Sequence, residues 1–262
     1  MADSKIFKDI LIENIGYRVK DGKCFFCKAK LIPGEYCTCK NAEKINKYFR
    51  KINSHLEKVE TFNNFFEDKQ ILAELKKNAN TPDLFNGYDL SFYEIENESQ
   101  KKGFDIVSDY YKNAVKNFLF GTNLIILGNY GTGKTALISV LCNLLTEKFL
   151  FDCRFVNIVD LFDIVKASFS SLSIDTLKLI EIYKKADFLF LDDIDKKTPT
   201  NYAKELVYSI VNSRVENELP TIITANHDLE DLDKNFYGEA TISRLIHKSK
   251  IVLFTHKNKR FI

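Results

Sequence analysis

The sequence lacks long apolar runs, internal repeats and low-complexity tracts. No stretch of the 262 residues approaches the roughly eighteen consecutive apolar residues that a membrane-spanning helix needs. The first residues, Met1–Lys5, do not have the pattern of a secretory signal peptide. These absences predict a cytoplasmic protein, in which cysteines are thiols or metal ligands rather than disulfides.

Net charge is only +2, and it excludes no class of partner by itself. Its distribution is uneven, since residues 1–60 contain 13 Lys and Arg against 8 Asp and Glu, and residues 244–262 contain six Lys and Arg and no acid. Basic ends are typical of proteins that contact a polyanion, although a solvated lysine surface has the same composition. The 45 % hydrophobic content and 22 Phe suffice for one large domain with a small module.

A phosphate-binding loop is the strongest motif, because residues 128–135 fit the pattern G-x-x-x-x-G-K-[ST]. An apolar run at residues 123–127 predicts a buried strand before it, and residues 136–145 predict an apolar helix after it. Such a loop turns backbone N–H groups toward phosphate oxygens, while Lys134 reaches the β- and γ-phosphates and the Thr135 hydroxyl ligates Mg²⁺. The candidate nucleotide-binding residues are Gly128, Asn129, Tyr130, Gly131, Thr132, Gly133, Lys134 and Thr135.

Two carboxylates follow a second apolar run, in the order Phe188–Leu191, Asp192, Asp193. After a phosphate loop, this pattern predicts that Asp192 binds Mg²⁺ and that Asp193 orients and deprotonates the attacking water. Aspartate is one methylene shorter than the glutamate more common there, so slow or partner-stimulated hydrolysis is expected. An acidic pair after a strand also occurs in ordinary surface turns.

The remaining chain alternates strands and helices, which predicts an α/β fold with a parallel sheet. Asn226 ends one expected strand, where its amide could position the lytic water, or it could simply belong to a turn with His227 and Asp228. A helix is expected at residues 103–119 after a polar loop at residues 94–102. The five expected strands are residues 123–127, 153–158, 187–191, 220–224 and 250–254.

Four cysteines near the N-terminus are spaced as metal ligands. Cys24 and Cys27 form a C-x-x-C pair, and Cys37 and Cys39 follow nine residues later. Four thiols within sixteen residues favour a structural zinc site, which would fold a segment that has little core of its own. A redox dithiol or unrelated buried thiols are the alternatives, and the former lacks its usual βαβ context.

Amphipathic helices are predicted between the cysteines and the α/β region. In the first of these helices, an apolar stripe with alternating spacings of four and three could pack on the chain's own core or on a partner; it consists of Ile45, Phe49, Ile52, Leu56 and Val59. The sequence thus predicts a zinc-binding module at residues 1–60, a linker helix at residues 61–80 and the nucleotide-binding domain at residues 81–262.

Several motifs together resemble the DnaC/DnaI family of AAA+ ATPases, the bacterial replicative-helicase loaders. They are the phosphate loop, Leu191–Ile194, Ser213–Asn226 and Ser243–Leu245. The resemblance implies an AAA+ P-loop fold with a five-stranded parallel sheet and no C-terminal lid. It also implies ATP hydrolysis, a hexameric replicative helicase and single-stranded DNA as partners, and an ATP-dependent homo-oligomer on the helicase.

Further roles rest on the same resemblance. Arg244, which by composition is a surface arginine, would act as a finger in a neighbouring subunit's site. The cysteine module resembles the zinc-bearing N-terminal domain of the DnaI-type loaders, which implies that it binds the helicase. The candidate DNA-contacting residues are Lys166, Lys178, Lys184 and Lys185.

The chain departs from the family pattern at two places. Asp195 follows Ile194 where the family usually has glycine, and the segment Phe254–Arg260 lacks the glycine and aspartate expected there, which leaves a sensing role for Arg260 open. Two other functions stay open as well. One is an IstB-like transposition helper ATPase, and the other is an adapter that binds ATP as a switch without hydrolysing it.

Overall fold

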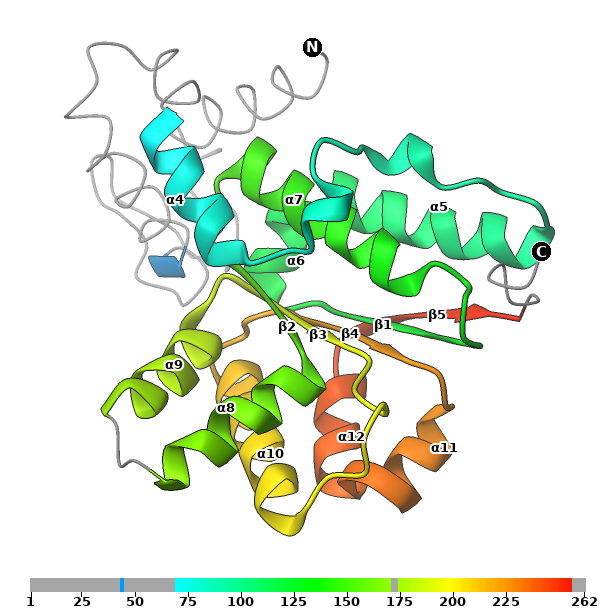
Figure 1. Cartoon of the computed structure of the whole chain (residues 1–262). Helices are drawn as coiled ribbons and strands as arrows, with labels where there is room; N and C mark the ends of the chain where they lie inside the picture. The colour runs from blue at the N-terminus through cyan, green and yellow to red at the C-terminus, as the bar shows by residue number, and fades with distance from the viewer. Residues whose placement is uncertain (1–42, 45–68, 171–173, 256–262) are drawn as a thin grey trace, which may run out of the picture. The chain divides into compact units, whose positions relative to one another are not determined.

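The computed structural model describes residues 43–44, 69–170 and 174–255 (Figure 1). The chain divides into two units, residues 1–72 and residues 73–262, and the nucleotide-binding motifs all belong to the second. In the described part of the chain, no helix is long and apolar enough to span a membrane.

Five parallel strands form a single sheet, in the order β2-β3-β4-β1-β5. Each strand expected from the sequence is present, and each observed boundary lies within one residue of the expected one. The parallel α/β prediction is therefore confirmed. The strands are β1 (Asn123–Gly128), β2 (Cys153–Asn157), β3 (Phe188–Asp192), β4 (Thr221–Ala225) and β5 (Ser249–Phe254).

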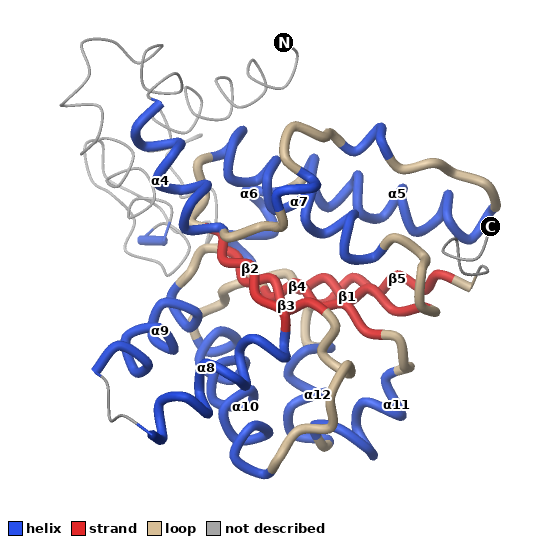
Figure 2. Tube along the Cα trace, in the orientation of Figure 1, coloured by secondary structure: helices blue, strands red, loops and turns tan. Residues whose placement is uncertain are grey.

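Helices cover both faces of this sheet, so the second unit has three layers (Figures 1 and 2). One face carries α5 (Glu98–Lys112), α6 (Ala114–Phe120) and α7 (Lys134–Phe149). The other face carries α8 (Ile158–Ser170), α9 (Ile174–Lys185), α10 (Asn201–Glu216), α11 (Leu229–Asp231) and α12 (Glu239–Ile246). The remaining described elements are α4 (Lys69–Ala79), η1 (Asp83–Phe85), η2 (Leu90–Phe92) and the π-helical η3 (Leu232–Tyr237).

Burial follows from these layers. Every residue of β1, β3 and β4 is buried, because central parallel strands are covered on both faces. The edge strand β5 instead alternates, with Val252 and Phe254 buried and Ile251 and Leu253 exposed. Helix α5 packs closely on β5, since a Cβ added to Gly103 would lie 2.5 Å from a ring carbon of Phe254.

The helical prediction before β1 needs two corrections. The helix expected at residues 103–119 is two helices, α5 and α6, that meet at Asn113. The expected polar loop at residues 94–102 is also wrong in its second half, because α5 begins at Glu98. A capping box explains this start: the Asn97 side chain accepts from the Gln100 N–H, and the Gln100 side chain accepts from the Asn97 N–H.

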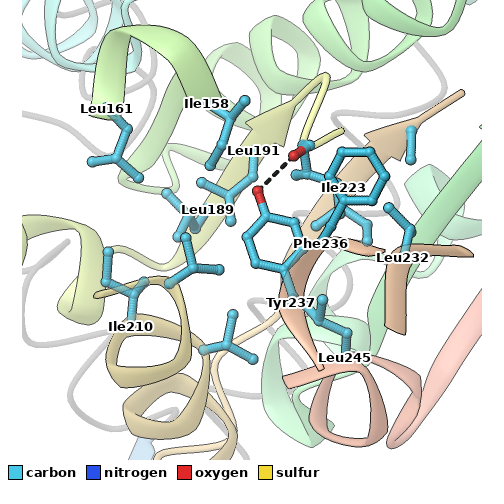
Figure 3. Close-up of a cluster of buried hydrophobic side chains, with 14 of the residues drawn as sticks. Ile158, Leu161, Leu189, Leu191, Ile210, Ile223, Leu232, Phe236, Tyr237 and Leu245 are labelled. Atoms are coloured by element: carbon cyan, nitrogen blue, oxygen red, sulfur yellow. Dashed lines mark hydrogen bonds between the residues drawn. The ribbon is translucent and has the colours of Figure 1, made fainter. Parts of the chain in front are cut away.

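The core beneath the sheet joins β3 and β4 to α10, η3 and α12 (Figure 3). One polar contact crosses it, where the Tyr237 hydroxyl donates to the Ile194 carbonyl oxygen at 2.5 Å. Burial raises the pKa of Tyr237, so this hydroxyl stays a donor. The bond ties the segment after β3 to the residue that precedes Gly238 and α12.

Candidate nucleotide-binding site

The phosphate loop connects β1 to α7 through glycines with positive φ angles. Gly128, Gly131 and Gly133 have φ values of 147°, 75° and 82°. A Cβ added to Gly128 would lie 2.4 Å from the Phe254 carbonyl oxygen, closer than any real contact allows. Neighbouring backbone and local conformation therefore both require glycine at this position.

Lys134, the first residue of α7, is only 5 % exposed. Its ammonium donates to the carbonyl oxygens of Gly128 at 2.7 Å and Asn129 at 2.9 Å, and to Oδ1 of Asn226 at 2.9 Å. A buried ammonium is tolerated because such oxygens replace its water. The structure thus brings together Lys134 and Asn226, which are 92 positions apart in the sequence.

Tyr93 contacts the loop at Thr132 and Gly133, and it was not identified from the sequence. Its hydroxyl donates to the Thr132 carbonyl oxygen at 2.9 Å, and its ring would lie 3.0 Å from a Cβ added to Gly133. Burial raises the pKa of Tyr93 to about 12, so the phenol remains a donor at neutral pH. Tyr130, by contrast, is 55 % exposed at the tip of the loop.

Asp192 ends β3 and lies beside the first turn of α7. The Thr135 hydroxyl is 3.0 Å from Oδ1 of Asp192, and the Thr224 hydroxyl donates to the same oxygen at 2.7 Å. Burial raises the pKa of Asp192, and the charge of Asp193 adds to this, while hydrogen bonds from Thr224, Thr135 and Asn157 oppose it. A cation bound here would remove the electrostatic penalty, so the pair suits Mg²⁺.

Thr224 and Asn157 were not singled out from the sequence, since both lie inside expected strands. The strand order explains their role: β3 is flanked by β2 and β4, so the last residues of both neighbours end beside Asp192. The signal that could have indicated them is a polar residue near the carboxyl end of an expected strand.

Asp193 adopts a left-handed conformation, with φ of 52°. Its N–H donates to the Thr224 hydroxyl at 2.8 Å, and its carboxylate is 22 % exposed and lies 3.5 Å from the Lys196 ammonium. Left-handed φ is uncommon outside glycine and typical of functional sites, where it turns a side chain out of the strand's alternation. The Asp193 carboxylate is thus accessible to water, whereas Asp192 is buried.

Asn226 follows β4, which lies between β1 and β3 in the sheet. Its amide oxygen accepts from Lys134 and its amide nitrogen donates to Asp195 at 3.0 Å. Asp195 is the residue at which the chain departs from the family pattern, and its side chain is fully buried. The departure therefore lies inside the candidate site.

Arg244 lies on α12, and its side chain contacts α10 and its own helix. Its Nε donates to Oδ1 of Asn212 at 2.5 Å, and its Nη1 donates to the Ala240 carbonyl oxygen at 3.0 Å. The guanidinium also lies over the Tyr208 ring, 4.8 Å from its centroid. Arg244 is half-buried and held by these contacts.

The candidate DNA-contacting lysines lie on two helices, α8 and α9. Lys184 and Lys185 pair with Glu181 on the same helix, at 3.4 and 3.2 Å. Lys178 and Lys185 line a groove of about 470 Å³, and Lys166 is exposed on α8. Cys24, Cys27, Cys37, Cys39 and Arg260 lie outside the described residues.

Comparison with known proteins agrees with this geometry. The family model described as IstB-like ATP binding protein matches residues 115–261. The chain is 26 % identical over 155 residues to the replicative helicase loader DnaC of Escherichia coli (strain K12), a match that covers 58 % of this chain and 60 % of the relative. It is 27 % identical over 145 residues to the replicative helicase loader DnaI of Bacillus subtilis (strain 168), covering 55 % of this chain and 45 % of the relative.

A solved structure has the same fold. The crystal structure of the DnaC helicase loader superposes with a TM-score of 0.60 at 23 % identity, over 66 % of this chain and 99 % of that chain. The five-stranded parallel α/β fold expected from the sequence is therefore shared with that protein. The chain spans 60 % or less of the full length of the two curated relatives.

Proposed function

The chain belongs to the family of IstB-like ATP-binding proteins, and we propose that it is an ATP-dependent loader that delivers a replicative helicase onto single-stranded DNA. The observation that carries this proposal is the match to relatives named as replicative helicase loaders. The family match over residues 115–261 contains the phosphate loop, Asp192 and Asn226. The geometry of that site supports the nucleotide-dependent part, because each group needed for triphosphate binding is present and close to its partners.

Lys134, Thr135 and Asp192 would hold the nucleotide and its metal. The ammonium of Lys134 would exchange carbonyl and amide oxygens for phosphate oxygens, which carry more negative charge. The Thr135 hydroxyl and the Asp192 carboxylate are one hydrogen bond apart and would both ligate Mg²⁺. Magnesium supplies charge neutralisation of the phosphates, and two protein ligands suffice because phosphates and water complete its shell.

Hydrolysis would use Asp193 as the base that orients and deprotonates water, since its carboxylate is accessible and its backbone is fixed by Thr224. Arg244 would complete the site of a neighbouring subunit in a homo-oligomer. Within its own subunit, Arg244 contacts Asn212 and Tyr208. On assembly its guanidinium would either keep these contacts while it reaches the neighbouring subunit or lose them. Such a finger is worth about 10³–10⁵ in rate in other ATPases and GTPases.

The N-terminal cysteines would form the zinc module that grips the helicase. Replacing Cys37 and Cys39 by Ser should release zinc and abolish helicase binding, while ATP affinity stays unchanged because the nucleotide site lies in the second unit. Zinc content, helicase pull-down and nucleotide titration of the same preparation measure the three effects. A double variant that still binds the helicase would contradict the assignment.

The proposal as a whole is tested by phosphate release and by co-purification. ATP turnover should rise with helicase and single-stranded DNA, and Lys134→Ala should abolish nucleotide binding. Negligible turnover with intact ATP binding would instead indicate an adapter switched by ATP. Co-purification with a transposase rather than a replicative helicase would favour a transposition helper.

A further inference from the structure

The buried carboxylate of Asp195 is the feature that the proposed mechanism does not use. Its side chain is fully buried three positions after Asp192, where an unpaired charge would be very costly. Four donors from two consecutive residues surround it. They are the Asn226 N–H at 2.6 Å, the Asn226 Nδ2 at 3.0 Å, the His227 N–H at 2.7 Å and the His227 Nδ1 at 2.6 Å.

These contacts determine which end of the Asn226 amide faces the phosphate loop. An ammonium can only donate hydrogen bonds and a carboxylate can only accept them. The amide end near Lys134 must therefore be the oxygen, and the end near Asp195 must be the NH₂ group. The same rule requires a proton on Nδ1 of His227, which orients the ring beside Phe236 at a centroid distance of 5.2 Å.

We propose that Asp195 is a positioning residue that fixes Asn226 with its amide oxygen toward the phosphate site. Asn226 then acts as a hydrogen-bond acceptor, first for Lys134 and, once Lys134 engages phosphate, for the attacking water. An oxygen cannot donate a hydrogen bond, so the end of the amide that faces the phosphate site does not donate to the γ-phosphate. This inference rests on the proposed ATPase activity, and it refines the role expected for Asn226 from the sequence.

The glycine expected at position 195 could not impose this orientation, because it has no side chain to accept from the amide. Without this carboxylate, Lys134 alone would select the amide orientation, and that contact is given up once Lys134 engages phosphate. The departure from the family pattern thus has a physical consequence: the extra carboxylate makes one of the two amide orientations the only satisfied one.

A carboxylate–amide exchange tests the proposal. In Asp195→Asn the new NH₂ group would face the NH₂ group of Asn226, and in Asn226→Asp two carboxylates would face each other. The double variant restores a complementary pair, with an amide at 195 donating to a carboxylate at 226 whose other oxygen faces Lys134. Asp228→Asn is the matched control, because Asp228 lies in the same loop but caps α11 instead.

Turnover at saturating ATP and ATP affinity are measured for the four variants. Asp195→Asn should lose about 10- to 100-fold in turnover with affinity within about threefold, since an orienting contact is lost but the cradle remains. Asn226→Asp should lose at least as much turnover and should also bind ATP more weakly, because its carboxylate faces the phosphates. The turnover of the double variant should recover to within about tenfold of that of the unmodified chain. The control Asp228→Asn should have the turnover of the unmodified chain. Wild-type turnover in Asp195→Asn, or a double variant no faster than Asp195→Asn, would overturn the proposal.

Thermal unfolding separates this result from failure of the proposed function. Each single variant should lower the midpoint by about 5 °C, and the double variant should recover most of that loss, because the buried hydrogen bond is restored. This cycle needs no hydrolysis. If the unmodified chain hydrolyses no ATP, the proposed function fails. If the midpoint of the double variant is lowered by as much as the two single variants' losses added together, the Asp195–Asn226 pairing itself is refuted.

Discussion

Replacing Arg214 by methionine should destabilise the folded chain by about 3–5 kcal/mol, because it leaves several buried carbonyl oxygens without their hydrogen-bond donor. Arg214 lies in α10 and is 0 % exposed, among the largest fully buried side chains of the described residues. Methionine fills much of the same volume, so the change removes the hydrogen-bond donors with little change in packing.

The magnitude follows from what the guanidinium contacts. It donates to the carbonyl oxygens of Tyr183 at 2.7 Å, Ala186 at 2.9 Å and Pro220 at 2.6 Å, with longer bonds to the Lys184 carbonyl and the Thr221 hydroxyl. Each buried carbonyl left without a donor costs about 1–3 kcal/mol, or roughly 3–9 kcal/mol for the three short bonds before any relaxation.

Two further effects adjust this figure. Burial lowers the pKa of Arg214, which means that the charge itself is costly to bury and that methionine recovers part of the loss. The Tyr183 and Lys184 carbonyls belong to the last turn of α9, where a positive charge also compensates the helix dipole. Because Pro220 immediately precedes β4, the same side chain joins the end of α9 to the start of that strand.

Chemical and thermal denaturation of the full chain measure the effect. A loss of about 3–5 kcal/mol corresponds to a midpoint lowered by about 10 °C in a domain of this size. Lys204→Met is the matched control, because it removes the same charge from the same helix at a partly exposed position, and it should change stability by less than about 0.5 kcal/mol. A loss below about 1 kcal/mol for Arg214→Met would refute the reasoning.

Other substitutions probe the site and the sheet. Burial raises the pKa of Asp192 above 3.8, so ionisation of this carboxyl costs folding free energy at neutral pH. Asp192→Asn should therefore raise the thermal midpoint of the nucleotide-free chain at neutral pH, and it should abolish the further rise that MgATP causes in the unmodified chain. A lower midpoint in the nucleotide-free variant would contradict this. Asp193→Asn should retain ATP binding and lose turnover, because asparagine tolerates the left-handed backbone but cannot accept the proton; unchanged phosphate release would exclude its role as base. Gly103→Ala should cost about 1–3 kcal/mol in unfolding free energy, since the added methyl would overlap Phe254 and Val252, and a neutral result would show that α5 can move away from β5.

Local patterns predicted much of the fold. The five strands were found because each is a short, mainly apolar run. The phosphate loop was found because its positive φ angles require glycine at positions such as Gly128 and Gly133, which gives the loop a recognisable sequence pattern. The break at Asn113 and the early start of α5 were missed. A capping box such as Asn97–Gln100 uses common polar residues, which also occur in loops.

The candidate site was predicted only as a set of separate pieces. Lys134, Asp192 and Asn226 were identified, but Thr224 and Tyr93 were not, since hydroxyls in a strand or a loop carry no pattern of their own. Asp195 was visible only as a departure from an expected glycine. Its importance depends on Asn226 and His227, which lie 31 and 32 positions away in the sequence.

The sequence by itself determined the parallel α/β architecture, the phosphate loop and the chemical identity of its groups, because these depend on local periodicity and on backbone conformations that few residues can adopt. Only the tertiary structure decided how those groups are paired. Placing β4 between β1 and β3 sets Thr224 against Asp192 and Asn226 between Lys134 and Asp195. Strand order sets these contacts, and it arises from packing across the whole sheet rather than from any one segment.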